Sequence, residues 1–134
     1  IGVVFSLNKD EVSLKQLISS ILPPLTVGCS VISLSNDSGL LALKFAEDIN
    51  NSDLPAGALN ILSGDFGKLI DDISKHVEIN LLAIHKELSN ENIKKIEENA
   101  SSSVKRVKIY PSTEGISSIL PYLETKTVWH PKGT

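Results

Sequence analysis

Short apolar runs alternate along the whole chain with longer segments in which apolar residues recur at every third or fourth position. Runs of this kind are typical of buried strands, and the longer segments predict helices with one buried face. Strands that are joined by helices pair in parallel, with the helices on both faces of the sheet. We therefore expect one doubly wound α/β domain over residues 1–134, with a mainly parallel sheet of about six strands. The predicted strands span residues 3–7, 30–34, 58–62, 81–84, 104–110 and 126–130.

Residues that start helices follow most of these strands. Asn8 and Glu11 have the spacing of a capping box, so we expect Asn8 to cap a first helix whose buried face runs from Leu14 to Leu25. Asp37 stands between two other capping residues and is expected to begin the next helix. Ser89 has the same role after the fourth strand. The turns between the elements are short, which fits a compact parallel sheet.

Composition excludes several classes of partner. The 134 residues carry a formal net charge of −3, which gives no electrostatic reason to bind nucleic acid or an anionic membrane. The basic residues Lys105, Arg106 and Lys108 are expected to form the solvated face of an edge strand. No apolar run is long enough to span a membrane and no signal peptide opens the chain, so we expect a cytoplasmic protein. The chain has no methionine, which indicates a module of a longer polypeptide.

Neither cysteine nor histidine forms a recognisable metal site. Cys29 is the only cysteine, so no disulfide framework is possible, and it follows Gly28 into a buried strand, where we expect a packed core thiol. The three histidines, His76, His85 and His130, lie too far apart in sequence for a metal-ligand spacing. The sequence therefore predicts no metal.

Several stretches resemble the coenzyme-binding domain of the aldehyde dehydrogenase superfamily, which has a Rossmann-like fold. They are PPLTVGCSVISLSNDSGLLALKFAEDI at 23–49, SDLPAGALNILSG at 52–64, GVVFSLN at 2–8 and VKRVKIY at 104–110. The resemblance covers roughly residues 2–110, and the Leu-Pro-Ala-Gly turn with its following strand is its most specific part. It implies NAD(P) as cofactor and oxidation of an aldehyde to a carboxylate as the activity of the whole enzyme.

The resemblance also implies functional roles for individual residues, and some of these residues could have only a structural role instead. Asn8 matches the family asparagine that helps to hold the oxyanion of the thiohemiacetal, but it could simply cap the first helix. Asp37 matches an acidic residue that contacts the adenosine ribose, and it too could be only a cap. Leu34 stands where the family has a lysine for the ribose or its phosphate.

Two turns depart from the family pattern. A Phe-Thr-Gly-Ser turn of the family, whose glycine admits the dinucleotide, is replaced by Ile-His-Lys-Glu at 84–87. We expect the Lys86 side chain and the Glu87 charge to close the phosphate position. A Glu-Leu-Gly-Gly turn that supplies the general base is replaced by Tyr-Pro-Ser-Thr at 110–113. An alternative anion site at Ser-Gly-Asp-Phe-Gly, 63–67, reads more simply as the start of a helix.

The C-terminal YLETKTVW resembles a strand near the end of aldehyde dehydrogenase chains, where it helps subunits to associate. Trp129 could anchor such an interface, or it could be a core residue over the last helix. A homo-oligomer, another protein or another module of the same chain would be the partner.

Two functions stay open at this point. The first is a non-catalytic pseudoenzyme, a module of the kind found as the degenerate second unit of two-module aldehyde dehydrogenases, which supports protein assembly and binds no cofactor. The alternative is the nucleotide-binding portion of a working NAD(P)-dependent aldehyde dehydrogenase.

Overall fold

The computed structural model describes residues 2–8, 13–35, 40–85, 87–109 and 115–131. In these residues five strands alternate with four helices, and two short 3-10 helices follow the last strand. In chain order these elements are β1 (Val3–Leu7), α1 (Leu14–Thr26), β2 (Ser30–Ser35), α2 (Leu40–Asn50), β3 (Leu59–Ser63), α3 (Phe66–Lys75), β4 (Leu81–Ile84), α4 (Asn90–Ser101), β5 (Arg106–Ile109), η1 (Ile116–Ser118) and η2 (Leu120–Tyr122).

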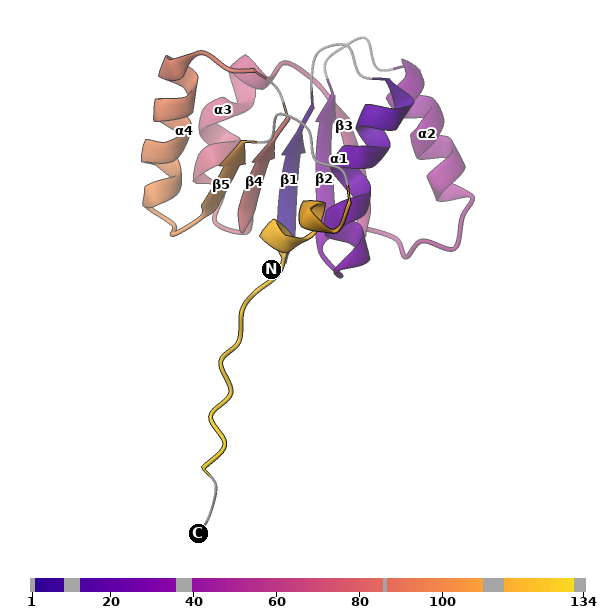
Figure 1. Cartoon of the computed structure of the whole chain (residues 1–134). Helices are drawn as coiled ribbons and strands as arrows, with labels where there is room; N and C mark the ends of the chain where they lie inside the picture. Colours follow the sequence, from indigo (N-terminus) through magenta and orange to yellow (C-terminus); the bar gives the residue numbers. More distant parts are fainter. Residues whose placement is uncertain (1, 9–12, 36–39, 86, 110–114, 132–134) are drawn as a thin grey trace.

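The strands form one parallel sheet in the order β3-β2-β1-β4-β5. Helices α1 and α2 cover one face of the sheet, and α3 and α4 cover the other (Figure 1). The chain starts in the middle of the sheet and reverses direction after β3, so β1 and β4 are neighbours although α1, β2, α2, β3 and α3 separate them in sequence. This arrangement confirms the doubly wound α/β prediction.

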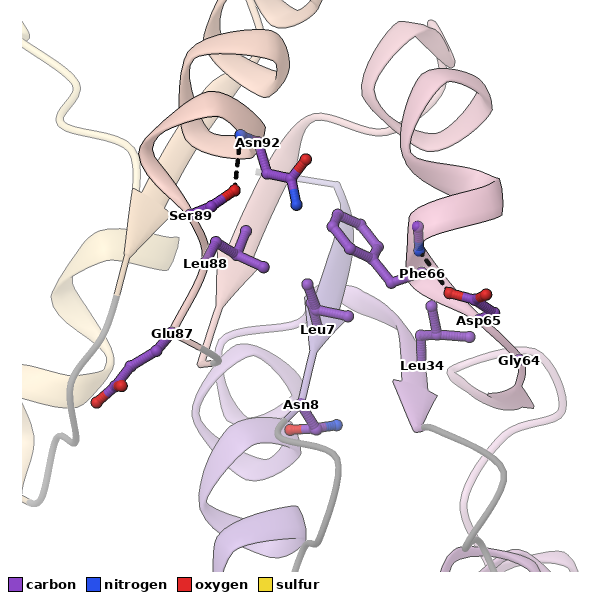
Figure 2. Close-up of a pocket in the computed structure, with 11 residues that line it drawn as sticks. Leu7, Asn8, Leu34, Gly64, Asp65, Phe66, Glu87, Leu88, Ser89 and Asn92 are labelled. Atoms are coloured by element: carbon purple, nitrogen blue, oxygen red, sulfur yellow. Dashed lines mark hydrogen bonds between the residues drawn. The ribbon is translucent and has the colours of Figure 1, made fainter.

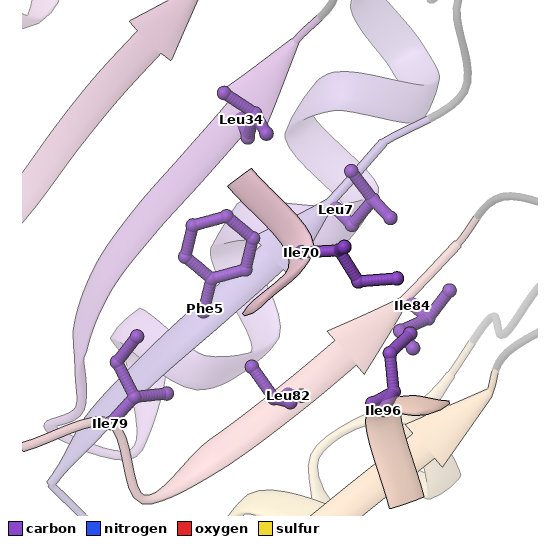
Figure 3. Close-up of a cluster of buried hydrophobic side chains, with 8 residues drawn as sticks. All are labelled: Phe5, Leu7, Leu34, Ile70, Ile79, Leu82, Ile84 and Ile96. Carbon is purple, nitrogen blue, oxygen red and sulfur yellow. The ribbon is translucent and has the colours of Figure 1, made fainter. Parts of the chain in front are cut away.

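The face under α3 and α4 holds the largest apolar cluster. Phe5 and Leu7 of β1 point into it, together with Leu34 of β2 and residues of β4, α3 and α4 (Figure 3). The alternation of side chains along a strand sends Val4, Ser6 and Asn8 to the opposite face. Burial of the apolar side chains of the cluster is the main contribution that stabilises a sheet of this kind. The cluster consists of Phe5, Leu7, Leu34, Ile70, Ile79, Leu82, Ile84 and Ile96.

The sixth predicted strand is absent from the sheet. Residues 126–130 are exposed and unpaired, and the segment 124–131 extends away from the body (Figure 1). The side chain of Trp129 is 86% exposed, so the interpretation of Trp129 as a core residue is wrong. Thr127 and Val128 favour extended backbone only locally, and a strand needs a neighbouring edge to pair with.

Smaller corrections concern the ends of elements. Helix α1 begins one turn later than expected, with Ser13 as its N-cap: the Ser13 hydroxyl accepts from the amide of Gln16, and the Gln16 side chain accepts from the amide of Ser13. Asn8 is therefore not the helix cap. The helix predicted near residues 116–123 is instead the pair of 3-10 helices. Ser89 caps α4 as predicted, by accepting from the amide of Asn92.

Lys105 is buried, contrary to the expectation of a solvated basic face. Its ammonium group donates to the main-chain carbonyls of Ser74 and His76 at the end of α3, and burial lowers the pKa of Lys105. Carbonyls at a helix end lack partners within the helix, so a lysine from another element can cap them. Lys105 thus joins the start of β5 to the C-terminus of α3.

A row of polar side chains lies under α1, on the face opposite the main cluster. Ser6 and Ser33 are neighbours on β1 and β2 and are fully buried. The side-chain amide of Asn8 donates to the Ser33 hydroxyl over 2.8 Å. His85 continues the row after β4, and its main-chain amide donates to the carbonyl of Leu7 over 2.8 Å. Burial lowers the pKa of His85 to about 4.

Among the described residues, no helix is long and apolar enough to cross a membrane.

Replacement of Gly2 by alanine should destabilise the fold by about 2 kcal/mol or more. Gly2 has a φ of +124°, and a Cβ there would collide with the Asn80 side-chain oxygen, which accepts the amide of Val3 over 2.8 Å. Gly57→Ala is the control, because Gly57 has a φ of +84° but open space around it, so only backbone strain of about 1 kcal/mol is expected. Urea unfolding measures both. Equal losses would contradict the clash with Asn80.

The free energy of unfolding should fall as the pH drops from about 6.5 towards 4. The folded-state pKa of His85 lies below its ordinary value of 6.5, so the unfolded chain takes up a proton first and is favoured. By pH 4.5 the loss from this group should approach about 2 kcal/mol. His85→Gln should remove this part of the pH dependence. Between pH 7.5 and 9 the difference between the two proteins should stay constant. An identical acid dependence in both would contradict the prediction.

Candidate functional site

A hollow of about 290 Å³ opens at the carboxyl ends of β1 and β2, between the starts of α3 and α4. Parallel strands end at the same edge of a sheet, and the crevice beside the point where strand order reverses is the usual ligand position in such folds. Figure 2 shows the side chains that surround it. The lining residues are Leu7, Asn8, Leu34, Gly64, Asp65, Phe66, Gly67, Glu87, Leu88, Ser89 and Asn92.

The inner wall of the hollow is apolar. Leu7 and Leu34 come from the ends of β1 and β2, while Phe66 and Leu88 face them from the two sides (Figure 2). The same four side chains belong to or pack on the main apolar cluster, so the wall is held rigidly by the core. A wall of this kind suits a flat apolar group such as an aromatic ring.

Polar groups stand at fixed places around this wall. The side-chain amide of Asn92, in the first turn of α4, is directed toward the hollow between Leu88 and Phe66 (Figure 2). It carries both donors and an acceptor, which a heterocyclic base can use. Asn8 lies at the opposite end, with its amide already donating to Ser33. Asn92 was not singled out from the sequence, where its only signal is its place in the first turn of a helix that follows a strand.

Both helix starts at the hollow are capped by side chains of the chain itself. The carboxylate of Asp65 accepts from the amide of Gly67 over 2.8 Å, and the Ser89 hydroxyl accepts from the amide of Asn92 over 3.3 Å. A phosphate at a helix N-terminus uses such amides as donors. Fewer donors are therefore left here for a phosphate, and the Asp65 carboxylate already interacts with the positive end of the α3 dipole.

Charge at the hollow is negative. Asp65 and Glu87 line it, and no described lysine or arginine does. Leu34, which stands at the lysine position of the resemblance, presents only an apolar side chain. The expectation that Glu87 brings negative charge to this place is therefore confirmed.

The expectation that Lys86 and Glu87 close the phosphate position stays a prediction, because Lys86 lies outside the described residues. The Glu87 side chain turns away from Leu7, toward the outside, and by itself leaves the hollow open (Figure 2). Residues 63–67 lead into helix α3, as expected. Gly64 and Gly67 also line the hollow, so this segment both starts a helix and forms part of the candidate site.

The remaining sequence candidates are divided between this site and other places. Asn8 lines the hollow and is 4% exposed. Asp37 and residues 110–113 lie outside the described residues. Cys29 precedes β2, at the opposite edge of the sheet from the hollow, where it is buried with Val4, Leu81 and Tyr122. It is a packed core thiol, as predicted.

Within the described parts of the chain, no group of three or more histidine, cysteine or acidic side chains could hold a metal ion. The site offers an apolar slot, an amide that can pair with a base and two carboxylates that can accept from hydroxyl groups. This set suits binding and orientation of a nucleoside.

Comparison with known proteins agrees with this description. The model of the aldehyde dehydrogenase family matches residues 1–113. Among curated proteins, the sequence comparison finds no match.

Similar solved structures are aldehyde dehydrogenases. An aldehyde dehydrogenase of Bartonella henselae is 27% identical with a TM-score of 0.69, over 81% of this chain and 22% of that one. Betaine aldehyde dehydrogenase of Staphylococcus aureus in complex with NAD+ is 26% identical with a TM-score of 0.70, over 81% and 21%. A mutant of aldehyde dehydrogenase C of Pseudomonas syringae with NAD+ and octanal is 27% identical with a TM-score of 0.71, over 81% and 22%.

The chain thus corresponds to only about a fifth of the length of these enzymes. The part that matches contains the whole parallel sheet and the hollow at its carboxyl edge. With a family model that matches residues 1–113, this chain belongs to the aldehyde dehydrogenase family.

Proposed function

We propose that this chain is the nucleotide-binding portion of an aldehyde dehydrogenase-type protein and that its hollow binds the adenosine half of NAD. The open hollow between α3 and α4 is the observation that carries the proposal. Its volume of about 290 Å³ lies at the lower end of the range for ligand pockets, which suits a nucleoside rather than a whole dinucleotide. The solved complexes of two relatives with NAD+ support the choice of cofactor.

The walls of the hollow fit the parts of adenosine. The adenine ring would lie in the slot between Phe66 and Leu88, with the Asn92 amide at its edge. The ribose hydroxyls would donate to a carboxylate at the rim, such as that of Asp65. The NAD+ in the two relatives carries one phosphate fewer than NADP, and the negative rim with no described cation favours the less charged molecule.

In this proposal the chain binds and orients the nucleotide, and oxidation of an aldehyde to a carboxylate would need groups that these residues do not supply. Cys29 is at the wrong edge of the sheet to act as the nucleophile. Asn8 is placed beside the hollow, but its amide is engaged by Ser33. The proposal extends to a cytoplasmic location, which the presence of a single cysteine supports because disulfide frameworks mark secreted proteins.

A second candidate function is a non-catalytic role in protein assembly. The specific observation is the segment of residues 124–131, which is exposed along its whole length and carries Val128 at 68% and Trp129 at 86% exposure. Large aromatic side chains on an unpaired segment are typical of residues that become buried in an interface. This role does not exclude nucleotide binding, because the two features lie on different parts of the molecule (Figure 1).

Titration with NAD should shift the NMR signals of the amides at Gly64, Gly67, Leu88 and Asn92, with a dissociation constant on the order of millimolar. The binding should be weaker for NADP, because its extra phosphate meets the negative rim. Glu87→Lys should tighten NAD binding by about three- to tenfold, or roughly 0.6–1.4 kcal/mol, since it reverses a charge beside the phosphates. Neutral adenosine should bind both proteins equally.

Glu91→Lys is the matched control for Glu87→Lys. Glu91 lies in the first turn of α4, four residues after Glu87, but it does not line the hollow. A shift confined to other amides, or none with NAD at about 10 mM, would exclude the hollow as the nucleotide site. Equal tightening by both lysine variants would show that only the overall charge matters.

Trp129→Ala should reduce self-association or capture of a protein partner at least tenfold, since the anchor of the exposed segment is lost. Light scattering over a concentration series measures the mass of the parent and the variant. Leu40→Ala is the control, because Leu40 is 85% exposed but belongs to α2. A parent chain that remains monomeric and retains no partner, or a variant that behaves like it, would contradict the assembly role.

A further inference from the structure

We propose that β3 of one copy pairs antiparallel with β3 of a second copy, and that exposed leucines of α2 in each copy enter a hollow beside β3 of the other. This inference depends neither on the nucleotide site nor on the exposed segment 124–131. Three features support it: an open and uncharged strand edge, a hollow at the amino end of that edge, and two exposed leucines near its carboxyl end.

The outer edge of β3 offers main-chain groups to a further strand. In the described part of the chain, β3 stands at one end of the sheet and pairs only with β2. The Ala58 carbonyl accepts from Val31 and the Gly64 amide donates to Ser35, so the even-numbered residues of the strand hydrogen-bond toward β2. The amides and carbonyls of the odd-numbered residues therefore point outward. These residues are Leu59, Ile61 and Ser63.

The edge of β3 also lacks the features that usually prevent a strand edge from pairing with another chain. Soluble proteins protect such edges with charged side chains, especially lysine, and with proline or a bulge. The other edge strand, β5, carries Arg106 and Lys108. The sequence of β3, Leu-Asn-Ile-Leu-Ser, contains no charge and no proline, and its pairing with β2 is continuous over residues 59–63. β3 is therefore the edge that a second copy can join.

A two-fold axis perpendicular to the sheet at Ile61 satisfies this edge. The axis runs the two copies of β3 antiparallel and keeps α2 of both copies on one face of the joined sheet. Ile61 then lies opposite Ile61 of the second copy, and Leu59 lies opposite Ser63. Every outward-pointing residue exchanges two hydrogen bonds with the residue opposite to it. An axis at any other residue would leave some of these outward groups unpaired.

A second hollow, of about 350 Å³, lies beside the amino end of β3, between the end of α2 and the turn that leads into the strand. Its apolar lining includes Ala46, Ile49, Leu54, Pro55 and Leu59. None of the described residues that line it is charged. An aliphatic side chain that moves from water into this β3 hollow therefore gains free energy by burial.

Two leucines of α2 have no such burial in the single chain. Leu43 is 56% exposed and Leu40 is 85% exposed. Leu43 lies three residues before Ala46 and seven before Asn50, both of which line the β3 hollow, so it lies on the same side of the helix. Leu40 is the first residue of α2, one turn before Leu43. The exposed leucines therefore extend the apolar side of α2 away from the β3 hollow.

The two-fold axis brings these leucines to the β3 hollow of the other copy. Helix α2 starts at the carboxyl ends of the strands and ends beside the amino end of β3 (Figure 1). Because the axis reverses the direction of the helix, the start of α2 in one copy comes beside the end of α2 in the other. One short strand and part of one helix form each side of this contact, less than in a permanent dimer, so we expect a dissociation constant on the order of 10–100 μM.

Disulfide cross-linking tests the pairing, because the antiparallel register places Asn60 opposite Leu62 of the second copy. Both side chains are exposed, so cysteine at either position should not disturb the fold. A mixture of the Asn60→Cys and Leu62→Cys variants should form a linked dimer under mild oxidation, since Cα atoms of such opposite residues are about 4.5 Å apart. Each variant alone should cross-link at least tenfold less, because its two cysteines would lie roughly 8 Å apart.

The parent chain is the control for the cross-linking, because its only cysteine, Cys29, is buried and should form no linked dimer. Equal cross-linking in the mixture and in each variant alone would show collision without a register and would overturn the proposed pairing. Trp129→Ala should leave the cross-linking of the mixture unchanged. Loss of the cross-link in that variant would assign the association to the segment 124–131 and would overturn the role of β3.

Matched leucine variants test the β3 hollow as the receiving surface. Leu43→Lys should weaken association at least tenfold in light scattering and lower the cross-linking of the cysteine mixture, because a charge would have to enter an apolar hollow. Leu41→Lys is the control and should leave association unchanged. Leu41 is 43% exposed on the same helix, but it precedes Leu43 by two residues and so lies on nearly the opposite side.

Circular dichroism spectra would verify that both lysine variants are folded. Equal effects of Leu41→Lys and Leu43→Lys would exclude the β3 hollow as the receiving surface. A parent chain that stays monomeric at millimolar concentration would overturn the whole inference.

Discussion

The parallel pairing of β1 with both β2 and β4 is the constraint on which the other features depend. It places the ends of three strands side by side, so that Leu7 and Leu34 form a wall and Asn8 and His85 form a polar row on the other face. The same pairing buries Phe5 between α3 and the sheet. A shift of β1 by one residue would exchange the two faces and would remove both the core and the wall of the hollow. The shape of the candidate site therefore depends on the register of β1 with β2 and β4.

The sequence predicted the fold well because its signals were local and repeated. The apolar periodicity located four helices and five strands, and Ser89 was recognised as a cap from its residue type alone. The errors arose where a local pattern needs a distant partner. Asn8 has the residue type of a cap, but the register of β1 with β2 brings it to Ser33 instead. The segment 126–130 has strand-like residues but no edge beside it within the chain.

The candidate site was predicted in position but not in shape. The departure from glycine in the turn at 84–87 correctly indicated negative charge, whereas the direction of the Glu87 side chain, which keeps the hollow open, depends on three-dimensional contacts. Asn92 lies in the first turn of α4 and so points to the strand ends, but many helices begin with asparagine for capping alone. Helix periodicity therefore identifies the wall of such a site more readily than its polar groups.

The hollow and the exposed segment 124–131, for which functions are proposed above, lie at opposite ends of the strands, which bears on whether they can influence each other (Figure 1). The hollow is formed at the carboxyl ends by Leu7, Leu34 and the starts of α3 and α4, whereas the segment 124–131 leaves the body at the amino ends. They share no residue. Coupling between two sites requires an element whose state both of them bias. A sheet held in register on both sides of β1 is a poor candidate for such an element, so nucleotide binding and association should be nearly independent in free energy.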